Sequence, residues 1–189
     1  MVVDVTNSMA PYTSQVLQWI KLDLSMGRTL HYTFFTDGDG KPDRKKVIGS
    51  TGGIHHSRER LVDPMLATIG RAMKKCKNND LPENDIEAIL AGMKECPECK
   101  EIVLVADNYS KMRDYQLLAQ INKPVHVIPC GITSGVNIQY LWMARKTQGS
   151  IHTPTQHIDD LWKLQEQETV EIGGITYGVV NGKFTVVGW

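Results

Sequence analysis

One segment restricts the possible folds more than any other: Ile102-Val-Leu-Val-Ala106, an uninterrupted apolar run followed by Asp107. A strand that is apolar at every position has both faces buried, which is typical of the central strands of a parallel sheet covered by helices. Short apolar runs alternate along the chain with amphipathic stretches, and this alternation predicts repeated strand and helix units. The sequence therefore predicts an α/β domain with a mostly parallel sheet.

The apolar runs and the helical periodicities predict an order of elements. Strands are expected at 1–5, 30–36, 46–49, 102–106 and 125–128, with a last edge strand near 148–152. Helices are expected at 11–26, 57–75, from Pro82 to about 95, and at 112–121, 138–146 and 157–167. The strand at 46–49 would pair antiparallel with 30–36 as a hairpin. We thus expect a six-stranded, mostly parallel sheet with one antiparallel edge strand and helices on both faces.

The last part of the chain changes character. Three runs of β-forming residues, 169–172, 175–180 and 184–187, are broken at Gly173-Gly174 and at Asn181-Gly182. An Asn-Gly pair between two such runs is typical of a type I′ hairpin turn. We expect a three-stranded antiparallel meander, which divides the chain into a main domain at 1–160 and a C-terminal appendage at 161–189 packed on it.

The charge balance restricts the partners. The 21 Lys and Arg residues are cancelled by 21 Asp and Glu residues, so the surface has no basic excess with which to bind nucleic acid or an anionic membrane. No window approaches the roughly 20 apolar residues that span a bilayer. Neither nucleic acid binding nor membrane insertion is therefore expected.

Polar side chains follow the predicted strands at the edge where ligands bind in open α/β sheets. Hydroxyl and carboxylate oxygens, without a neighbouring His or Cys, suit a hard ion such as Mg²⁺ or Mn²⁺ rather than zinc. Asp80 also has capping-box spacing with Glu83, and could simply cap the helix that begins at Pro82. The candidate metal ligands are Asp4, Thr6, Ser8, Asp80 and Asp107, with the hydroxyl of Thr51 as an alternative to Asp80.

Two of these segments resemble a known family. Asp4-x-Thr6-x-Ser8 resembles the D-x-[ST]-x-S signature of von Willebrand factor type A domains, and Asp80-Leu-Pro-Glu-Asn-Asp-Ile-Glu-Ala is similar to the G-G-D-x-P-E-x-x-x-A segment of bacterial members. The resemblance covers about 1–160 and implies a Rossmann-like fold with a metal-ion-dependent adhesion site. It implies that Thr6 and Ser8 bind Mg²⁺, or Mn²⁺ or Ca²⁺, directly. Asp4 and Asp107 would act largely through water, and one coordination position would accept a partner's carboxylate.

Three functions remain open on these grounds. The first is a non-enzymatic protein-binding module that engages an acidic partner group through the cation, and the second is a scaffold domain with a vestigial metal site. The third is a Mg²⁺-dependent phosphoryl-transfer enzyme of the haloacid dehalogenase class, although Thr6 stands where that class has its second Asp. Gly49-Ser-Thr-Gly-Gly53 does not match G-x-S-x-G and the chain has no phosphate-binding loop, so no enzyme is expected.

The cysteines bear on the cellular compartment. Cys96 and Cys99 close a predicted helix, a position that favours a local disulfide in an exported protein and two free thiols in a cytosolic one. Cys76 and Cys130 are expected to be single thiols. The first strand reaches Asp4 after three residues, although strands usually have about five or six. We therefore expect a removed upstream segment and a secreted or periplasmic protein, with a cytoplasmic location as the alternative.

Overall fold

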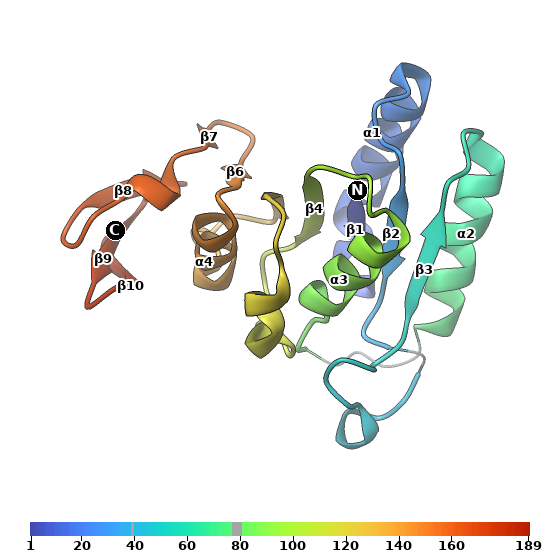
Figure 1. Ribbon diagram of the computed structural model, residues 1–189, viewed down its shortest axis with the longest axis horizontal. Helices are drawn as coiled ribbons and strands as arrows, with labels where there is room; N and C mark the ends of the chain where they lie inside the picture. Colours follow the sequence, from blue (N-terminus) through green and yellow to red (C-terminus); the bar gives the residue numbers. More distant parts are fainter. Residues whose placement is uncertain (39, 77–80) are drawn as a thin grey trace.

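The computed structural model describes residues 1–38, 40–76 and 81–189 (Figure 1). Across these residues the main sheet has seven strands in the order β3-β2-β1-β4-β5-β6-β7. β2, β1, β4, β5 and β6 run parallel to one another, while β3 and β7 pair antiparallel at the two edges. The predicted α/β class with a mostly parallel sheet is confirmed. The strands are β1 (Val2–Asp4), β2 (Tyr32–Phe35), β3 (Ile54–Ser57), β4 (Ile102–Asp107), β5 (Val125–Cys130), β6 (Ser150–His152) and β7 (His157–Ile158).

Helices cover both faces of this sheet, as predicted. The α-helices are α1 (Thr13–Met26), α2 (Val62–Lys75), α3 (Asp85–Glu95) and α4 (Ile138–Thr147), and the 3₁₀ helices are η1 (Asn7–Tyr12), η2 (Asp43–Lys45), η3 (Tyr115–Gln120) and η4 (Leu161–Lys163). Ile20 of α1 and Met65 of α2 share one apolar core with Val105 of β4. Ile89 of α3 and Leu141 of α4 share the other with Leu104, so the alternate residues of β4 anchor both layers. None of the helices in the described part of the chain is long and apolar enough to cross a membrane.

The predicted antiparallel edge strand at 46–49 is wrong in position. The edge strand is β3, whose Ser57 and Ile54 pair with Tyr32 and Phe35 of β2. The segment near 49 is a loop instead, because the backbone N–H of Gly49 donates to the Glu87 carboxylate of α3 at 2.6 Å. The helix expected at 57–75 accordingly begins only at Val62, after this strand.

The predicted helix at 157–167 is also wrong. His157–Ile158 forms β7, which adds a second antiparallel edge and brings the sheet to seven strands instead of the expected six. β7 forms because the connection after β6 is a tight turn. In this turn the Thr153 N–H donates to the Gln156 carbonyl at 2.9 Å, and the chain then runs back along β6. Only the 3₁₀ turn η4 follows.

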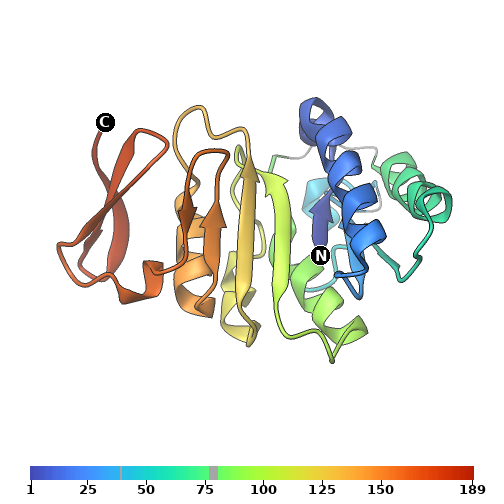
Figure 2. The same cartoon turned by 90° about the horizontal axis from the view of Figure 1, so that it is seen from above.

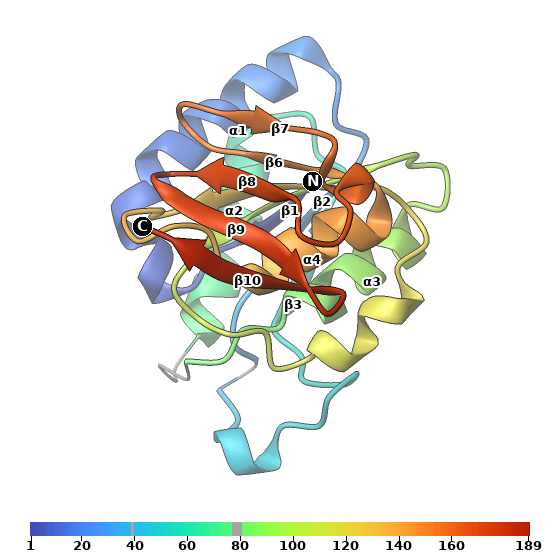
Figure 3. The same cartoon turned by 90° about the vertical axis from the view of Figure 1, so that its left-hand side faces the viewer.

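The C-terminal meander is confirmed. β8 (Thr169–Ile172), β9 (Ile175–Val180) and β10 (Lys183–Gly188) form an antiparallel sheet in the order β10-β9-β8, and Asn181 and Gly182 have the positive φ angles of a type I′ turn, 52° and 67°. Figure 3 shows this sheet facing the viewer with α4 behind it. Tyr177 anchors it, because its hydroxyl accepts a hydrogen bond from the Val136 N–H at 2.6 Å. The meander therefore packs on α4, and its apolar residues belong to the same core as α3, α4 and the sheet face that these two helices cover.

Candidate metal centre

The strand order places the expected ligand-binding edge at the carboxyl ends of β1 and β4. Successive strands run outward from β1 to β2 in one direction and from β4 to β5 in the other, so the order reverses between β1 and β4. Ligands of open α/β sheets bind beyond the carboxyl ends of the strands at such a reversal. Asp4 is the last residue of β1 and Asp107 the last of β4, and the structure brings these two side chains together.

A short turn after β1 brings the two hydroxyls to the same place. Oδ1 of Asp4 accepts a hydrogen bond from the Thr6 N–H at 2.8 Å, which bends the chain back toward the strand end. Thr6 Oγ1 then lies 2.7 Å from Ser8 Oγ. Both residues line a pocket of about 310 Å³, together with Glu83 and Tyr109. Hydrogen bonds thus link Asp4 to Thr6 and Thr6 to Ser8, and Asp107 lies beside Asp4.

Glu83 completes the group and was not predicted as a ligand. One carboxylate oxygen from each of Asp4, Glu83 and Asp107 lies within 4.8 Å of the other two. Glu83 does not cap the helix, because α3 begins at Asp85 and Asn84 is its N-cap. Its backbone is instead held against the loop after β4, where its carbonyl accepts the Arg113 N–H at 2.7 Å. The Pro-Glu step of the segment similar to bacterial family members was the signal that could have identified it.

The three carboxylates are buried, with exposed fractions of 1% for Asp4 and 3% for both Glu83 and Asp107. Oδ1 of Asp107 accepts the Tyr109 N–H at 2.7 Å. Within the described residues, however, Asp107 Oδ2 and Glu83 Oε2 are enclosed and accept no hydrogen bond. A buried carboxylate oxygen without a donor is costly, and a cation beside it removes that cost. The donor set of two hydroxyls and several carboxylate oxygens fits a hard divalent ion.

Burial and repulsion between neighbouring carboxylates raise the pKa values of Asp4 and Glu83. Burial raises the pKa of Asp4 to about 7, although its hydrogen bonds with Thr6 oppose the shift. Burial also raises the pKa of Glu83 far above its usual value, and the Asp4 charge and a hydrogen bond with Asp37 add to it. A bound cation would act in the opposite direction, since its charge favours ionised carboxylates.

Of the two remaining candidate ligands, the structure describes only Thr51, which does not join the group. Asp80 lies outside the described residues. Thr51 is buried elsewhere, and its hydroxyl donates to Oε1 of Glu87 at 2.8 Å while its N–H donates to Oε2 at 2.9 Å. Thr51 therefore fastens the loop before β3 to α3, which leaves its hydroxyl facing Glu87 and not the pocket.

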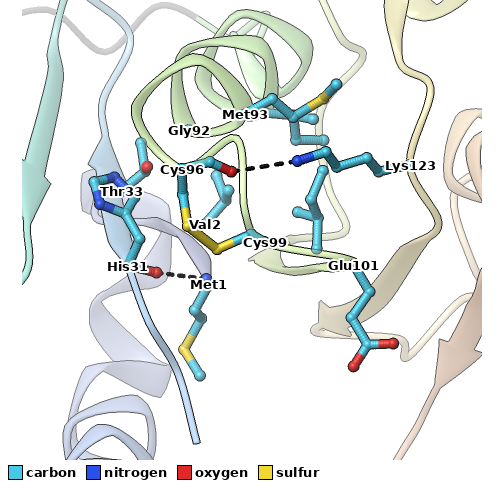
Figure 4. Close-up of a pocket in the computed structure, with 12 residues that line it drawn as sticks. Met1, Val2, His31, Thr33, Gly92, Met93, Cys96, Cys99, Glu101 and Lys123 are labelled. Carbon is cyan, nitrogen blue, oxygen red and sulfur yellow. Dashed lines mark hydrogen bonds between the residues drawn. A yellow bond between two sulfur atoms is a disulfide. The ribbon is translucent and has the colours of Figure 1, made fainter.

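A second cavity lies near the amino ends of β1 and β4 (Figure 4). The predicted disulfide between Cys96 and Cys99 is present there, with the two Cα atoms 5.4 Å apart, and Cys76 and Cys130 are free. Lys123 closes one side by donating to the Cys96 carbonyl at 3.2 Å. The cavity measures only about 20 Å³, which is room for about one water molecule. It therefore offers no space for a ligand.

Comparison with known proteins adds no relative. No protein-family model matches the chain, and neither the curated proteins nor the solved structures give a match.

Proposed function

We propose that this protein is a non-enzymatic binding module of the von Willebrand factor type A kind. In this proposal it engages an acidic group of a partner protein through a divalent cation, Mg²⁺ or alternatively Mn²⁺ or Ca²⁺. One observation carries the proposal: Asp107 Oδ2 and Glu83 Oε2 are buried without a hydrogen-bond donor among the described residues, in the same group as the hydroxyls of Thr6 and Ser8.

The contacts of each side chain support a division of roles. Both carboxylate oxygens of Asp4 already face backbone N–H groups, those of Thr6 at 2.8 Å and Asp107 at 3.4 Å. Asp4 is therefore suited to orient the turn and to hold a metal-bound water. The hydroxyls of Thr6 and Ser8 can serve as neutral direct ligands, which leave the ion more of its charge for an external oxygen.

Glu83 adds a third carboxylate that the proposed roles of Asp4, Thr6 and Ser8 do not include. A third carboxylate strengthens the attraction for a cation, but it also repels an acidic group that approaches the bound ion. The Glu83→Gln variant keeps the shape and removes the charge. We expect it to bind Mg²⁺ more weakly than wild type and to bind an acidic partner more tightly at saturating Mg²⁺.

Metal binding is tested by calorimetric titration with Mg²⁺ and Mn²⁺ of the wild type and the Asp107→Asn variant, with folding checked by circular dichroism. The matched control is Asp114→Asn. Asp114 is another buried acid, whose Oδ2 accepts the Glu87 N–H at 2.6 Å and which lies outside the group of three. We expect one ion to bind the wild type and the control, and none to bind Asp107→Asn. Equal binding by all three proteins would show that the site is placed wrongly.

The partner step needs its own assay, with an array of synthetic peptides that contain Asp or Glu and matched peptides that contain Asn or Gln. Binding of the acidic peptides in Mg²⁺, its loss in EDTA and its loss in Thr6→Val support the proposed module. If the ion binds but no peptide binding depends on it, the scaffold function becomes the better description.

A further inference from the structure

A row of histidines lies on the sheet face opposite the core that α3 and α4 cover. In β5 and β6, Val125, Val127 and Ile151 point into that core. The alternate residues His126, Ser150 and His152 therefore share the other face. Figure 2 shows β6 and β7 toward the viewer with no helix of the described chain in front of them. The row is consequently open to solvent at its outer end, where His157 is exposed and His152 is half-buried.

Strand register places these side chains next to one another. His126 of β5 is the direct partner of Ser150 of β6, and His152 of β6 is the direct partner of His157 of β7. The neighbouring N–H of Thr153 donates to Gln156, so the His152 and His157 pair is of the type without its own backbone hydrogen bonds. In this type the side chains of an antiparallel pair come closest. Nδ1 of His152 and Nδ1 of His157 accordingly face each other at 2.8 Å.

The other ring nitrogens all have oxygen partners. Nε2 of His152 lies 2.6 Å from Ser150 Oγ, which lies 2.6 Å from Nδ1 of His126. Nε2 of His126 faces Glu101 at 3.5 Å. Nε2 of His157 faces Asp159 at 3.8 Å. The row therefore forms one chain of polar contacts with a carboxylate at each end.

One set of tautomers gives each of the other ring nitrogens a role toward its oxygen partner and leaves the contact between the two Nδ1 atoms without a proton. With the proton on Nε2, His152 donates to Ser150, Ser150 donates to His126, and His126 presents its own Nε2 proton to Glu101. With the proton on Nε2, His157 presents it to Asp159. Neither Nδ1 atom then carries a proton, so the 2.8 Å contact is no longer a hydrogen bond and both Nδ1 lone pairs are available to bind a metal ion. Histidine ligands are commonly oriented through the other nitrogen by a carboxylate or hydroxyl in this way.

We propose that His152 and His157 form a second metal site, selective for an imidazole-preferring transition ion such as Zn²⁺ and separate from the hard-ion site at the ends of β1 and β4. Two nitrogens bound to one tetrahedral Zn²⁺ at about 2.0–2.1 Å are about 3.3 Å apart, so the rings need to separate by only about half an ångström. Asp159 and the Ser150–His126 pair orient the two ligands. Two protein ligands leave the remaining positions of the ion for water or for a donor from a bound molecule.

The test is calorimetric titration with Zn²⁺ in excess Mg²⁺, which occupies hard-ion sites but does not compete for imidazole. We expect one Zn²⁺ per wild-type chain, binding weakened more than 10-fold in His157→Gln, and binding weakened about 10-fold in His126→Gln through the lost orientation of Ser150. The matched control is His56→Gln, because His56 also contacts a histidine, His31 at 3.1 Å, but lies on β3. Electron paramagnetic resonance with Cu²⁺ as the probe should show two bound imidazole nitrogens in wild type and one in His157→Gln.

The Asp107→Asn variant keeps the two metal proposals distinct. It should lose Mg²⁺ and retain Zn²⁺, so failure at one site leaves the other site's result readable. Equal Zn²⁺ affinity in wild type and His157→Gln overturns the second site. Loss of Zn²⁺ binding in Asp107→Asn overturns it as well, because it would assign the Zn²⁺ to the strand ends.

Discussion

Gly149 joins α4 to β6 at a point where a side chain has no room. A Cβ added there would lie 1.8 Å from the carbonyl oxygen of Val125, whereas carbon and oxygen atoms need about 3 Å. The backbone would have to move by about 1.2 Å, because the obstacle is the main chain of β5 and not a flexible side chain. A movement of that size disrupts the pairing of β5 with β6 next to His126 and Ser150.

The cost of Gly149→Ala follows from these contacts. Overpacking strain costs about 1–3 kcal/mol, and one or two weakened backbone hydrogen bonds cost about 1 kcal/mol each. We expect the free energy of unfolding to fall by about 3 kcal/mol. For a chain of 189 residues this corresponds to a decrease in melting temperature of about 6–12 °C.

Urea unfolding followed by circular dichroism measures this effect, with Gly70→Ala as the matched control. Gly70 lies inside α2, and a Cβ there meets nothing within 4 Å. The control should gain up to about 1 kcal/mol, because alanine is the better helix former. An error of about 0.5 kcal/mol is usual for such measurements. If the free energies of unfolding of Gly149→Ala and wild type differ by less than that, the end of α4 does not approach β5 as closely as described.

Three further substitutions test other parts of the structure. Burial lowers the pKa of His31 from 6.5 to about 4, so the folded state resists protonation that the unfolded chain accepts. Relative to His31→Asn, the wild type should therefore lose up to about 3 kcal/mol of its free energy of unfolding as the pH falls from 6.5 to 4, measured as the difference between the two proteins in urea titrations. Gln148 ends α4 with a φ of 56°, so Gln148→Gly should raise the free energy of unfolding by about 1 kcal/mol; an unchanged denaturation midpoint would contradict this strain. Tyr177→Phe leaves the buried N–H of Val136 without its acceptor and should cost about 1–3 kcal/mol by thermal unfolding, whereas no change would mean that the meander is anchored by its apolar contacts alone.

The parts of the fold that were predictable are those in which local sequence and burial agree. β4 is apolar on both faces because it is central, and Asn181-Gly182 fixes the meander turn by its own backbone preferences. β3 has the sequence Ile-His-His-Ser, which has no strand-like alternation, and it is a strand only because it pairs with β2. β7 has two residues, too few for any periodicity to indicate a strand.

The candidate site shows the same division. Asp4 and Asp107 could be placed together because the ends of parallel strands meet at one edge of the sheet. Glu83 could not be assigned in this way, because its position depends on where α3 begins. A start at Pro82 makes Glu83 a capping residue, whereas the observed start at Asp85 leaves it in the loop beside the two aspartates. That boundary is set by contacts of the Glu83 backbone with the loop at 111–113.

The two-residue strand β7 has a consequence for how copies of this chain can meet. The backbone N–H and C=O groups of an edge strand are unpaired and can bind a strand of another chain. A longer edge strand presents more of these groups and promotes such pairing more strongly. β7 offers only His157 and Ile158 before the charged pair Asp159-Asp160, and charges next to a short edge strand oppose such addition. Growth of the main sheet from this edge into a fibril-like stack is therefore disfavoured by the architecture itself.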